Sequence, residues 1–287
     1  MSPGCYLGYL LQTSRILMEL ILKNGLPLLQ FSHLARYERM VHAVTTRQGG
    51  VSEGPFASLN LGINIGDDFE RVYLNRKKVL SALGWESALM VTSVQVHGNE
   101  VVVVDKALTT REASGREKTL CGVDGLITKE KGILLTIKVA DCFPVFLYDP
   151  ERHAIGLLHA GWRGTAQSII RRGLKGMADA YGTEPKNLQA GIGPGIGQCC
   201  YHVGREVREA FGHDSALDTC FSESCQRTSS QFDLRKAICQ ELVGCGVKKE
   251  KISIATECTS CSQELFFSHR RDKGRTGRMM AVIGLRD

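Results

Sequence analysis

Residues able to do chemistry gather in one stretch of this chain. Positions 138–165 read KVADCFPVFLYDPERHAIGLLHAGWRGT, which places Asp141 and Cys142 inside an apolar run and His159 at the end of the next. Burying a carboxylate is costly unless it is paired, hydrogen-bonded or near a metal, so a plain core strand is a poor location for Asp141. A carboxylate, a thiol and an imidazole together indicate a metal site or a cysteine nucleophile with a histidine base.

The two apolar runs are expected to form a hairpin. Asp-Pro-Glu-Arg (149–152) separates them, which predicts a four-residue loop flanked by Tyr148 and His153. In that register Cys142 lies directly opposite His159, with Cβ atoms about 4.5–5.5 Å apart. One metal ion can bridge a sulfur and an imidazole at this spacing, and the same contact would let His159 activate Cys142. Both chemistries remain open at this point.

A third ligand is available at the end of another apolar strand. His97 stands in a His-Gly-Asn turn, a position from which a side chain can reach over the edge of a sheet. Two histidines, one cysteine and an open fourth position are the arrangement of catalytic zinc. His97, Cys142 and His159 are therefore candidate ligands for zinc, with copper the less favoured metal, and a Cys142 nucleophile with His159 as its base remains the alternative. By strand alternation Lys138 could border this site, but we expect an exposed lysine there.

Composition limits the class of protein. The chain has 287 residues, 43% hydrophobic and 23% charged, with a net charge of +6. These values are ordinary for a globular protein, and no apolar run approaches the roughly 20 residues that cross a bilayer. The basic residues are dispersed rather than clustered, so we expect neither a nucleic-acid nor a membrane partner.

Cysteine usage points to a reducing compartment. The count is eleven, which is odd, and no secretory signal is evident, so we expect a cytoplasmic protein with free thiols. The Cys-x-x-Cys pair at 258–261 has no second ligand pair near it in the sequence and is interpreted as two free thiols. We expect the members of a wider group to be reduced and outside the zinc site: Cys199, Cys200, Cys220, Cys225, Cys258 and Cys261.

The remaining sequence predicts one domain over residues 28–287, preceded by an N-terminal extension, 1–27. Residues 1–17 could lie upstream of a natural start at Met18 and are expected to be dispensable. Short strands are predicted at His42–Thr45, Leu89–Val96, Glu100–Val104, Ile133–Val139, Phe143–Tyr148, Ala154–His159, Leu188–Gly191, Lys251–Ala255 and Met279–Leu285. Helices are predicted at Arg71–Leu83, Ala166–Tyr181, Arg205–Phe211 and Asp233–Cys245. This mixture indicates an α/β fold of the α+β kind, with mixed sheet layers and helices packed outside.

Six motifs, in order, resemble those of the laccase-domain or polyphenol-oxidase-like family, the YfiH-like proteins. They are TTRQGGVSEGPFASLNLG (45–62), QVHG (95–98), DGLITKEKGILLTIKVADCFPV (124–145), HAGWRGT (159–165), GIGPGIG (191–197) and CT followed by FFSHRRDKGRTGR (258–278). The resemblance implies a YfiH-like mixed-sheet fold and zinc held by His97, Cys142 and His159. His269 stands where the family often has tyrosine.

The resemblance also implies an activity. Members are described as purine nucleoside phosphorylases acting on adenosine, inosine, guanosine and S-methyl-5'-thioadenosine, with adenosine deaminase activity. Purine nucleosides and phosphate are then the expected partners of a monomer or weak homodimer. Asp141 is a candidate proton shuttle, or else a carboxylate that orients a ligand histidine. The arginines within the motifs are candidates for anion binding, and GIGPGIG could offer backbone N–H groups: Arg47, Arg163, Arg270 and Arg271.

Two alternatives remain at this stage. A zinc- or cysteine-dependent amidohydrolase that edits a cell-wall precursor peptide would use the same residues, and a metal-stabilised binding module is the third possibility. True laccase chemistry is disfavoured, because the eight histidines include no His-x-His pair. Cytidine-deaminase chemistry is disfavoured because Cys258-Thr-Ser-Cys261 lacks the preceding proline and His97 lacks the matching glutamate.

Overall fold

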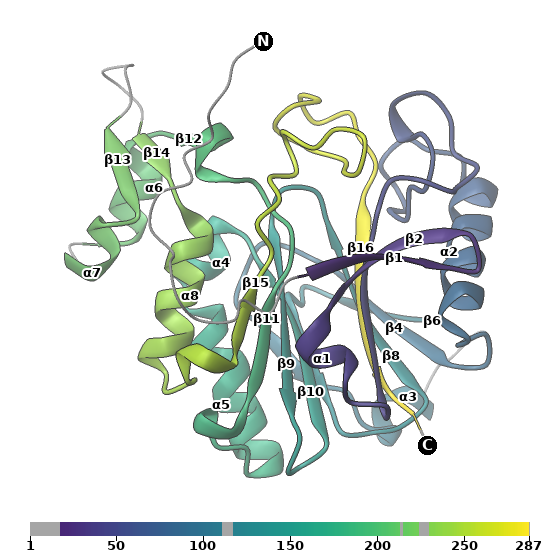
Figure 1. Cartoon of the computed structure of the whole chain (residues 1–287), viewed down its shortest axis with the longest axis horizontal. Helices are drawn as coiled ribbons and strands as arrows, with labels where there is room; N and C mark the ends of the chain where they lie inside the picture. Colours follow the sequence, from purple (N-terminus) through teal and green to yellow (C-terminus); the bar gives the residue numbers. More distant parts are fainter. Residues whose placement is uncertain (1–17, 111–116, 213–214, 224–229, 287) are drawn as a thin grey trace.

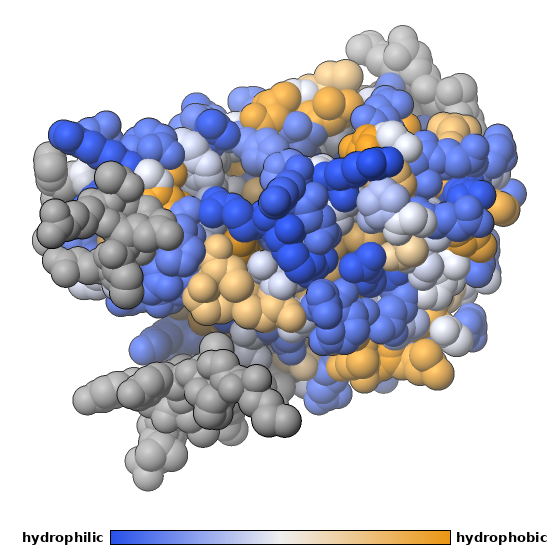
Figure 2. Space-filling model, turned by 90° about the horizontal axis from the view of Figure 1, so that it is seen from above, coloured by the Kyte–Doolittle hydropathy of each residue, from blue (hydrophilic) through white to orange (hydrophobic). Residues whose placement is uncertain are grey.

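The computed structural model describes residues 18–110, 117–212, 215–223 and 230–286. Two large β-sheets face each other in the centre and helices cover their outer faces (Figure 1). A small third sheet lies at one side of the molecule. Hydrophilic residues predominate on the face seen in Figure 2, with apolar residues in separate patches. The predicted fold class, mixed sheets with helices outside, is confirmed.

The seven-stranded sheet combines the N-terminal region with the C-terminal strand. Its order is β1 (Met18–Lys23), β2 (Leu26–Phe31), β3 (Met40–Thr45), β16 (Met279–Leu285), β8 (Ile133–Val139), β4 (Leu89–Val94) and β6 (Glu117–Cys121). The six-stranded sheet has the order β15 (Ile252–Ile254), β11 (Gln189–Ile192), β9 (Phe143–Asp149), β10 (Ala154–Ala160), β7 (Gly125–Thr128) and β5 (Val101–Val103). The small sheet has the order β12 (His202–Val203), β14 (Ser230–Phe232) and β13 (Phe221–Glu223).

Among the described residues, the long helices are α2 (Phe69–Leu83), α5 (Ile169–Tyr181) and α8 (Leu234–Gly244). The short helices are α1 (Ser32–Ala35), α3 (Lys106–Thr110), α4 (Trp162–Ala166), α6 (Arg205–Ala210) and α7 (Ser215–Asp218). Asp68 caps α2 by accepting from the Arg71 N–H, and Asp233 caps α8 by accepting from the Lys236 N–H. Each cap satisfies a backbone donor that the first turn leaves free.

Three apolar cores hold the layers together. The central one lies between the two large sheets and includes Phe31, Val91, Phe146 and Ile283, all fully buried. A second packs α5 and α8 against the outer face of the six-stranded sheet, and a third packs α2 against the other sheet. Strands buried on both faces read as continuous apolar runs, which is why β8, β9, β10 and β16 stood out in the sequence.

The predicted elements match the structure best where they are buried. Ile133–Val139 and Met279–Leu285 are confirmed to the residue. The helix predicted over 166–181 is confirmed from Ile169 to Tyr181 but begins three residues too early, because Ala166 ends the separate helix α4. Ser168 has φ near 61°, a left-handed conformation that interrupts helical hydrogen bonding and turns the second helix onto the sheet.

The predicted hairpin exists, but its register is shifted by two residues. His159 pairs with Pro144 and Ala154 pairs with Asp149, so the four-residue loop runs from Pro150 to His153. The Asp149 carboxylate accepts the N–H groups of Glu151 and Arg152, which starts the turn one residue later than expected. Because side chains alternate with a period of two, this shift keeps Cys142 on the face of His159.

The first sheet of the domain begins before residue 28, the predicted start of the domain. β1 begins at Met18 and pairs antiparallel with β2, so residues 18–27 belong to the seven-stranded sheet rather than to an extension. Residues 1–17 lie outside the described residues, and their dispensability stays a prediction. Within the part of the chain described, no helix is both long and apolar enough to span a bilayer.

Candidate active site

The structure brings the three predicted ligands together. His97 lies in the turn after β4, Cys142 in the bend between β8 and β9, and His159 near the end of β10. One donor atom from each lies within 4.8 Å of the other two. The two imidazole rings meet edge to face, with centroids 4.9 Å apart. Three separate segments therefore converge on one point.

A buried carboxylate that the sequence analysis missed holds two of these ligands. Asp124 is fully buried and accepts the backbone N–H groups of Val96, His97 and Gly98 at 2.9–3.1 Å. The same carboxylate accepts a hydrogen bond from Nδ1 of His159 at 2.8 Å. His159 is thereby left with Nε2 for a metal, the carboxylate–histidine arrangement of many zinc sites. The carboxylate hydrogen-bonded to His159 is therefore Asp124, not Asp141.

The electrostatics of the site favour charged side chains. Burial alone would raise the pKa of the Asp124 carboxyl, but its hydrogen bonds from His159 and the backbone hold that pKa below the ordinary value. Burial opposes ionisation of Cys142 also, yet His159 and His97 lower its pKa to about 6. Burial would lower the pKa of His159, whereas Cys142 and Asp124 raise it to about 9. These contacts favour the thiolate form of Cys142, the form in which a cysteine binds a divalent metal.

Two glycines of the HAGWRGT segment make room for the ligands. A Cβ on Gly161 would lie 3.0 Å from Cys142 Sγ and 3.3 Å from the His97 ring. A Cβ on Gly164 would lie 2.6 Å from the carbonyl oxygen of Gly98. Only glycine lets α4 pack this closely on the turn that carries His97. These contacts, with the S and N donor set, fit a zinc ion bound by His97, Cys142 and His159.

Asp141 occupies the bend beside Cys142 in a left-handed conformation, φ 88°. Its carboxylate accepts hydrogen bonds from the Thr259 hydroxyl and the Arg270 backbone N–H, each at 2.7 Å. Its carbonyl accepts the Ile196 N–H. Asp141 therefore connects the bend that carries Cys142 to the segments of Thr259, Arg270 and Ile196 through hydrogen bonds. Its side chain also borders the cavity.

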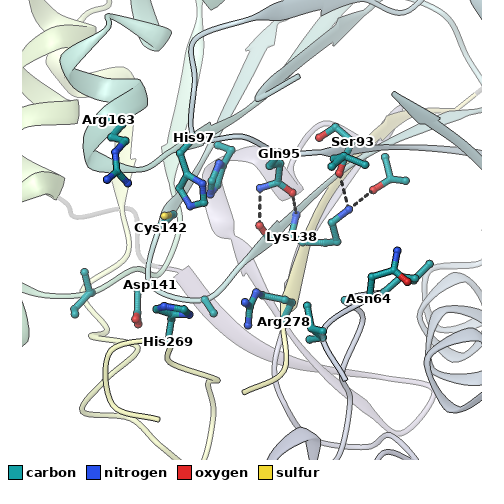
Figure 3. A pocket seen from close by; sticks show the side chains of 18 of the residues that line it. Asn64, Ser93, Gln95, His97, Lys138, Asp141, Cys142, Arg163, His269 and Arg278 are labelled. Atoms are coloured by element: carbon teal, nitrogen blue, oxygen red, sulfur yellow. Dashed lines mark hydrogen bonds between the residues drawn. The ribbon is translucent and has the colours of Figure 1, made fainter. Parts of the chain in front are cut away.

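The donor set opens into a cavity of about 770 Å³. Figure 3 shows His97, Cys142 and Arg163 at one end, Asn64 at the other and Lys138 between them. Trp162, Ile196 and Tyr201 supply apolar lining near the donor set. The cavity also includes polar residues that the sequence analysis did not select: Asn64, Arg76, Ser93, Gln95, Glu117 and Arg278.

Two residues noted in the sequence border this cavity. The expectation of an exposed Lys138 is wrong: its Nζ donates to the Ser93 carbonyl at 2.6 Å and to the Thr92 hydroxyl at 3.1 Å. Burial lowers the pKa of Lys138 to about 8. Gln95 fixes the Lys138 backbone through hydrogen bonds to its N–H and its carbonyl. His269 also lines the cavity.

The four candidate arginines divide into two pairs. Arg163 and Arg270 line the cavity, with guanidinium groups over Trp162 and Tyr201 at 4.4 and 5.1 Å. Arg47 instead bonds the carbonyls of Ala57 and Gln263, and Arg271 bonds those of Thr259 and Phe266. Neither Arg47 nor Arg271 lines the cavity, so their hydrogen bonds join loops rather than face a ligand.

The GIGPGIG turn directs several of its backbone donors at protein acceptors. The Gly193 N–H donates to Pro144, the Ile196 N–H to Asp141 and the Gly197 N–H to Cys258 Sγ. Those three groups are therefore not available to an anion. The glycines serve close packing instead, since a Cβ on Gly195 would lie 2.5 Å from the Phe143 ring.

Comparison with known proteins identifies the family. Residues 41–286 match the family described as multi-copper polyphenol oxidoreductase laccase. The chain belongs to this family. It is 40% identical over 253 residues to purine nucleoside phosphorylase YlmD of Geobacillus stearothermophilus, covering 86% of this chain and 90% of the relative. It is also 40% identical over 262 residues to a purine nucleoside phosphorylase of Deinococcus radiodurans, covering 91% of this chain and 94% of the relative.

Solved structures of this family share the fold. The hypothetical protein YfiH of Bacillus licheniformis superimposes with a TM-score of 0.83 at 36% identity, covering 90% of this chain and 96% of that one. YlmD of Geobacillus stearothermophilus superimposes with a TM-score of 0.82 at 36% identity, covering 91% of this chain and 96% of that one. The YfiH-like fold expected from the motifs is confirmed.

Proposed function

We propose that this chain is a zinc-dependent purine nucleoside phosphorylase that also deaminates adenosine. Its substrates would be adenosine, inosine, guanosine and S-methyl-5'-thioadenosine. Relatives that it matches over most of both chains are named purine nucleoside phosphorylases. The observation that carries the proposal is the donor set of His97, Cys142 and His159 beside two cavity-lining arginines.

The donor chemistry favours zinc over copper. One thiolate and two imidazoles around an open position suit catalytic zinc, which would supply a Lewis-acid centre at this end of the cavity. Within the described part of the chain, only one group of potential ligands contains histidine, and it has two. A multi-copper cluster needs many more imidazoles, so the family's description does not decide the metal of this chain.

The arginine pair would bind phosphate. Arg163 is exposed to the cavity, and Arg270 uses one terminal nitrogen for the His202 carbonyl and keeps the other N–H groups available. A guanidinium offers paired donors that match phosphate oxygens. Because the cavity lining includes both arginines and the donor set, phosphate and nucleoside would meet there. Trp162 and Tyr201 also line the cavity, and each holds one of these guanidinium groups over its ring.

Asp141 would move the proton in either reaction. Its oxygens each accept one hydrogen bond from the protein, and a carboxylate oxygen has a second lone pair. Deamination requires protonation of the departing ammonia, and phosphorolysis requires protonation of the departing purine. A carboxyl group that borders the cavity, in the bend that carries Cys142, can serve both.

Product analysis tests the proposal. Adenosine with phosphate should yield adenine and ribose 1-phosphate, and adenosine alone should yield inosine and ammonia. His97→Ala should remove nearly all turnover, with His153→Ala, a histidine in the β9–β10 loop, as the matched control. If neither product forms, the proposal fails, and hydrolysis of a cell-wall peptide amide would then support the amidohydrolase.

Alkylation separates metal chemistry from thiol chemistry. With zinc bound, Cys142 should react slowly with iodoacetamide and faster after chelation, and activity should follow the metal. A cysteine nucleophile paired with His159 predicts the opposite: rapid alkylation of untreated protein, activity indifferent to chelators and substantial turnover in His97→Ala.

A further inference from the structure

Four cysteines outside the active-site donor set meet at one point. Cys199 and Cys200 follow the GIGPGIG turn, and Cys258 and Cys261 begin the loop after β15. Their four sulfur atoms all lie within 4.8 Å of one another. The Cys-x-x-Cys pair thus has the second ligand pair that was not apparent in the sequence. We call these residues the four-cysteine cluster.

The sulfur spacing matches a single tetrahedral ion. A zinc–sulfur distance of about 2.3 Å in tetrahedral geometry separates the sulfurs by about 3.8 Å. Cys261 Sγ lies 3.6 Å from Cys199 Sγ and 3.4 Å from Cys200 Sγ. A disulfide would require about 2.05 Å, and all nine described cysteines carry free thiols. One cation would need only small movements of these side chains.

The backbone around Cys258 is arranged for a thiolate. The Gly197 N–H donates to Cys258 Sγ at 3.1 Å, and the N–H groups of Ser260 and Cys261 are also directed at that sulfur. Such N–H···S bonds stabilise negative charge on sulfur. Gly197 has no side chain to block the cluster, since a Cβ there would lie 3.2 Å from Cys199 Sγ and 3.3 Å from Cys258 Sγ.

Two arginines supply positive charge beside the cluster. Arg235 donates to the carbonyls of Thr256 and Glu257, directly before Cys258, and its buried Nε has no partner among the described residues. Arg271 donates to the carbonyls of Thr259 and Ser260, between the two cysteines of the pair. Four thiolates around a divalent ion carry a net charge of −2, and Arg235, which interacts with Cys258 and Cys199, offsets part of it, whereas Arg271 is also paired with Asp272.

We propose that the four-cysteine cluster binds one structural zinc ion, at a second metal site separate from His97, Cys142 and His159. Four thiolates close the coordination shell and leave no position for substrate, as in structural zinc sites. The ion would join two segments that also meet through the bridge between Gly195 and Cys258, the hydrogen bond from Thr259 N–H to Gly195 and that from Gly197 N–H to Cys258 Sγ. Sulfurs this close fit one ion rather than an iron–sulfur cluster.

This second ion would stabilise one wall of the cavity. Ile196 and Tyr201 flank the first cysteine pair and line the cavity. Thr259, inside the second pair, donates its hydroxyl hydrogen to Asp141. The cluster therefore lies behind the active site and fixes the segments that position Asp141.

Metal analysis of the full chain tests the proposal. Protein prepared with reductant should contain about two zinc ions, and the His97→Ala/Cys142→Ala variant should retain about one, with four sulfur neighbours near 2.3 Å by X-ray absorption. Cys258→Ser should lose one ion and keep the other, while Cys121→Ser, on the exposed strand β6, should keep both. The double variant leaves the cluster intact, so the test does not depend on whether Cys258→Ser folds.

Several results would overturn the proposal. A metal-free or iron-containing double variant, or a zinc shell that includes nitrogen, would exclude a four-thiolate zinc site. A disulfide among the four cysteines in freshly prepared protein would do the same. None of these results bears on the nucleoside reaction, which the products from adenosine decide separately.

Discussion

Replacing Asp124 with asparagine should weaken zinc binding at the active site. The carboxylate accepts four hydrogen bonds, three from the turn that carries His97 and one from His159 Nδ1. Asparagine is isosteric but has one acceptor oxygen, and its NH₂ group would face donors on the other side. In the native protein Oδ1 accepts from His97 N–H and His159 Nδ1, and Oδ2 accepts from Val96 N–H and Gly98 N–H. One of these two pairs of donors must lose its acceptor in the variant.

The magnitude follows from these contacts. A buried donor without an acceptor costs about 1–3 kcal/mol, and the backbone donors of the turn are only partly buried, so the free energy of unfolding should fall by about 1–3 kcal/mol. The substitution also removes a hydrogen bond that holds either the His159 ring or the backbone turn carrying His97 in place. Loss of such an outer hydrogen bond typically weakens metal binding about 10–100-fold, or about 1.4–2.8 kcal/mol.

Protection of Cys142 measures occupancy at this site alone. Alkylation of Cys142 is followed by peptide mass spectrometry across buffered free-zinc concentrations, and the concentration that halves the rate should rise about 10–100-fold in Asp124→Asn. Asp149→Asn is the matched control. Its carboxylate is also buried, but Oδ1 alone accepts the turn N–H groups, at the opposite end of the hairpin. Unchanged zinc protection in a folded Asp124→Asn variant would refute the reasoning.

Three further outcomes are expected. Arg163→Gln should raise the KM for phosphate about 10–100-fold and leave the free energy of unfolding unchanged. Arg47→Gln should lower the free energy of unfolding and leave the KM for phosphate unchanged. Kinetics and urea unfolding measure both effects, and a KM for phosphate in Arg163→Gln equal to that of the parent protein would contradict the first. Burial raises the pKa of Glu241 to about 7, so its contribution to stability is complete below pH 4.5 and declines as the pH rises through 7. Glu241→Gln should therefore add about 1–3 kcal/mol at pH 8 and little at pH 4.5; equal gains at both would exclude this cause. A chain beginning at Met18 should keep nucleoside turnover, because the first sheet starts there; lost turnover would show that residues 1–17 are needed.

The sequence alone determined the buried strands and the three metal-ligand candidates. Ile133–Val139 and Met279–Leu285 were predictable because a strand covered on both faces must be apolar throughout. His97, Cys142 and His159 were recognisable because their residue types are unusual beside such strands. Even with a hairpin register in error by two residues, Cys142 stayed on the correct face, since alternation repeats every two residues.

Only the tertiary structure decided which other side chains meet. Asp124 stands before an ordinary strand, and nothing local shows that its carboxylate collects donors from the His97 turn and from His159. Arg47 and Arg163 are alike in sequence, yet one joins loops and the other lines the cavity. The four-cysteine cluster depends on a parallel bridge between segments far apart in the chain. Local patterns reflect burial and periodicity, whereas these contacts depend on how distant segments pack together.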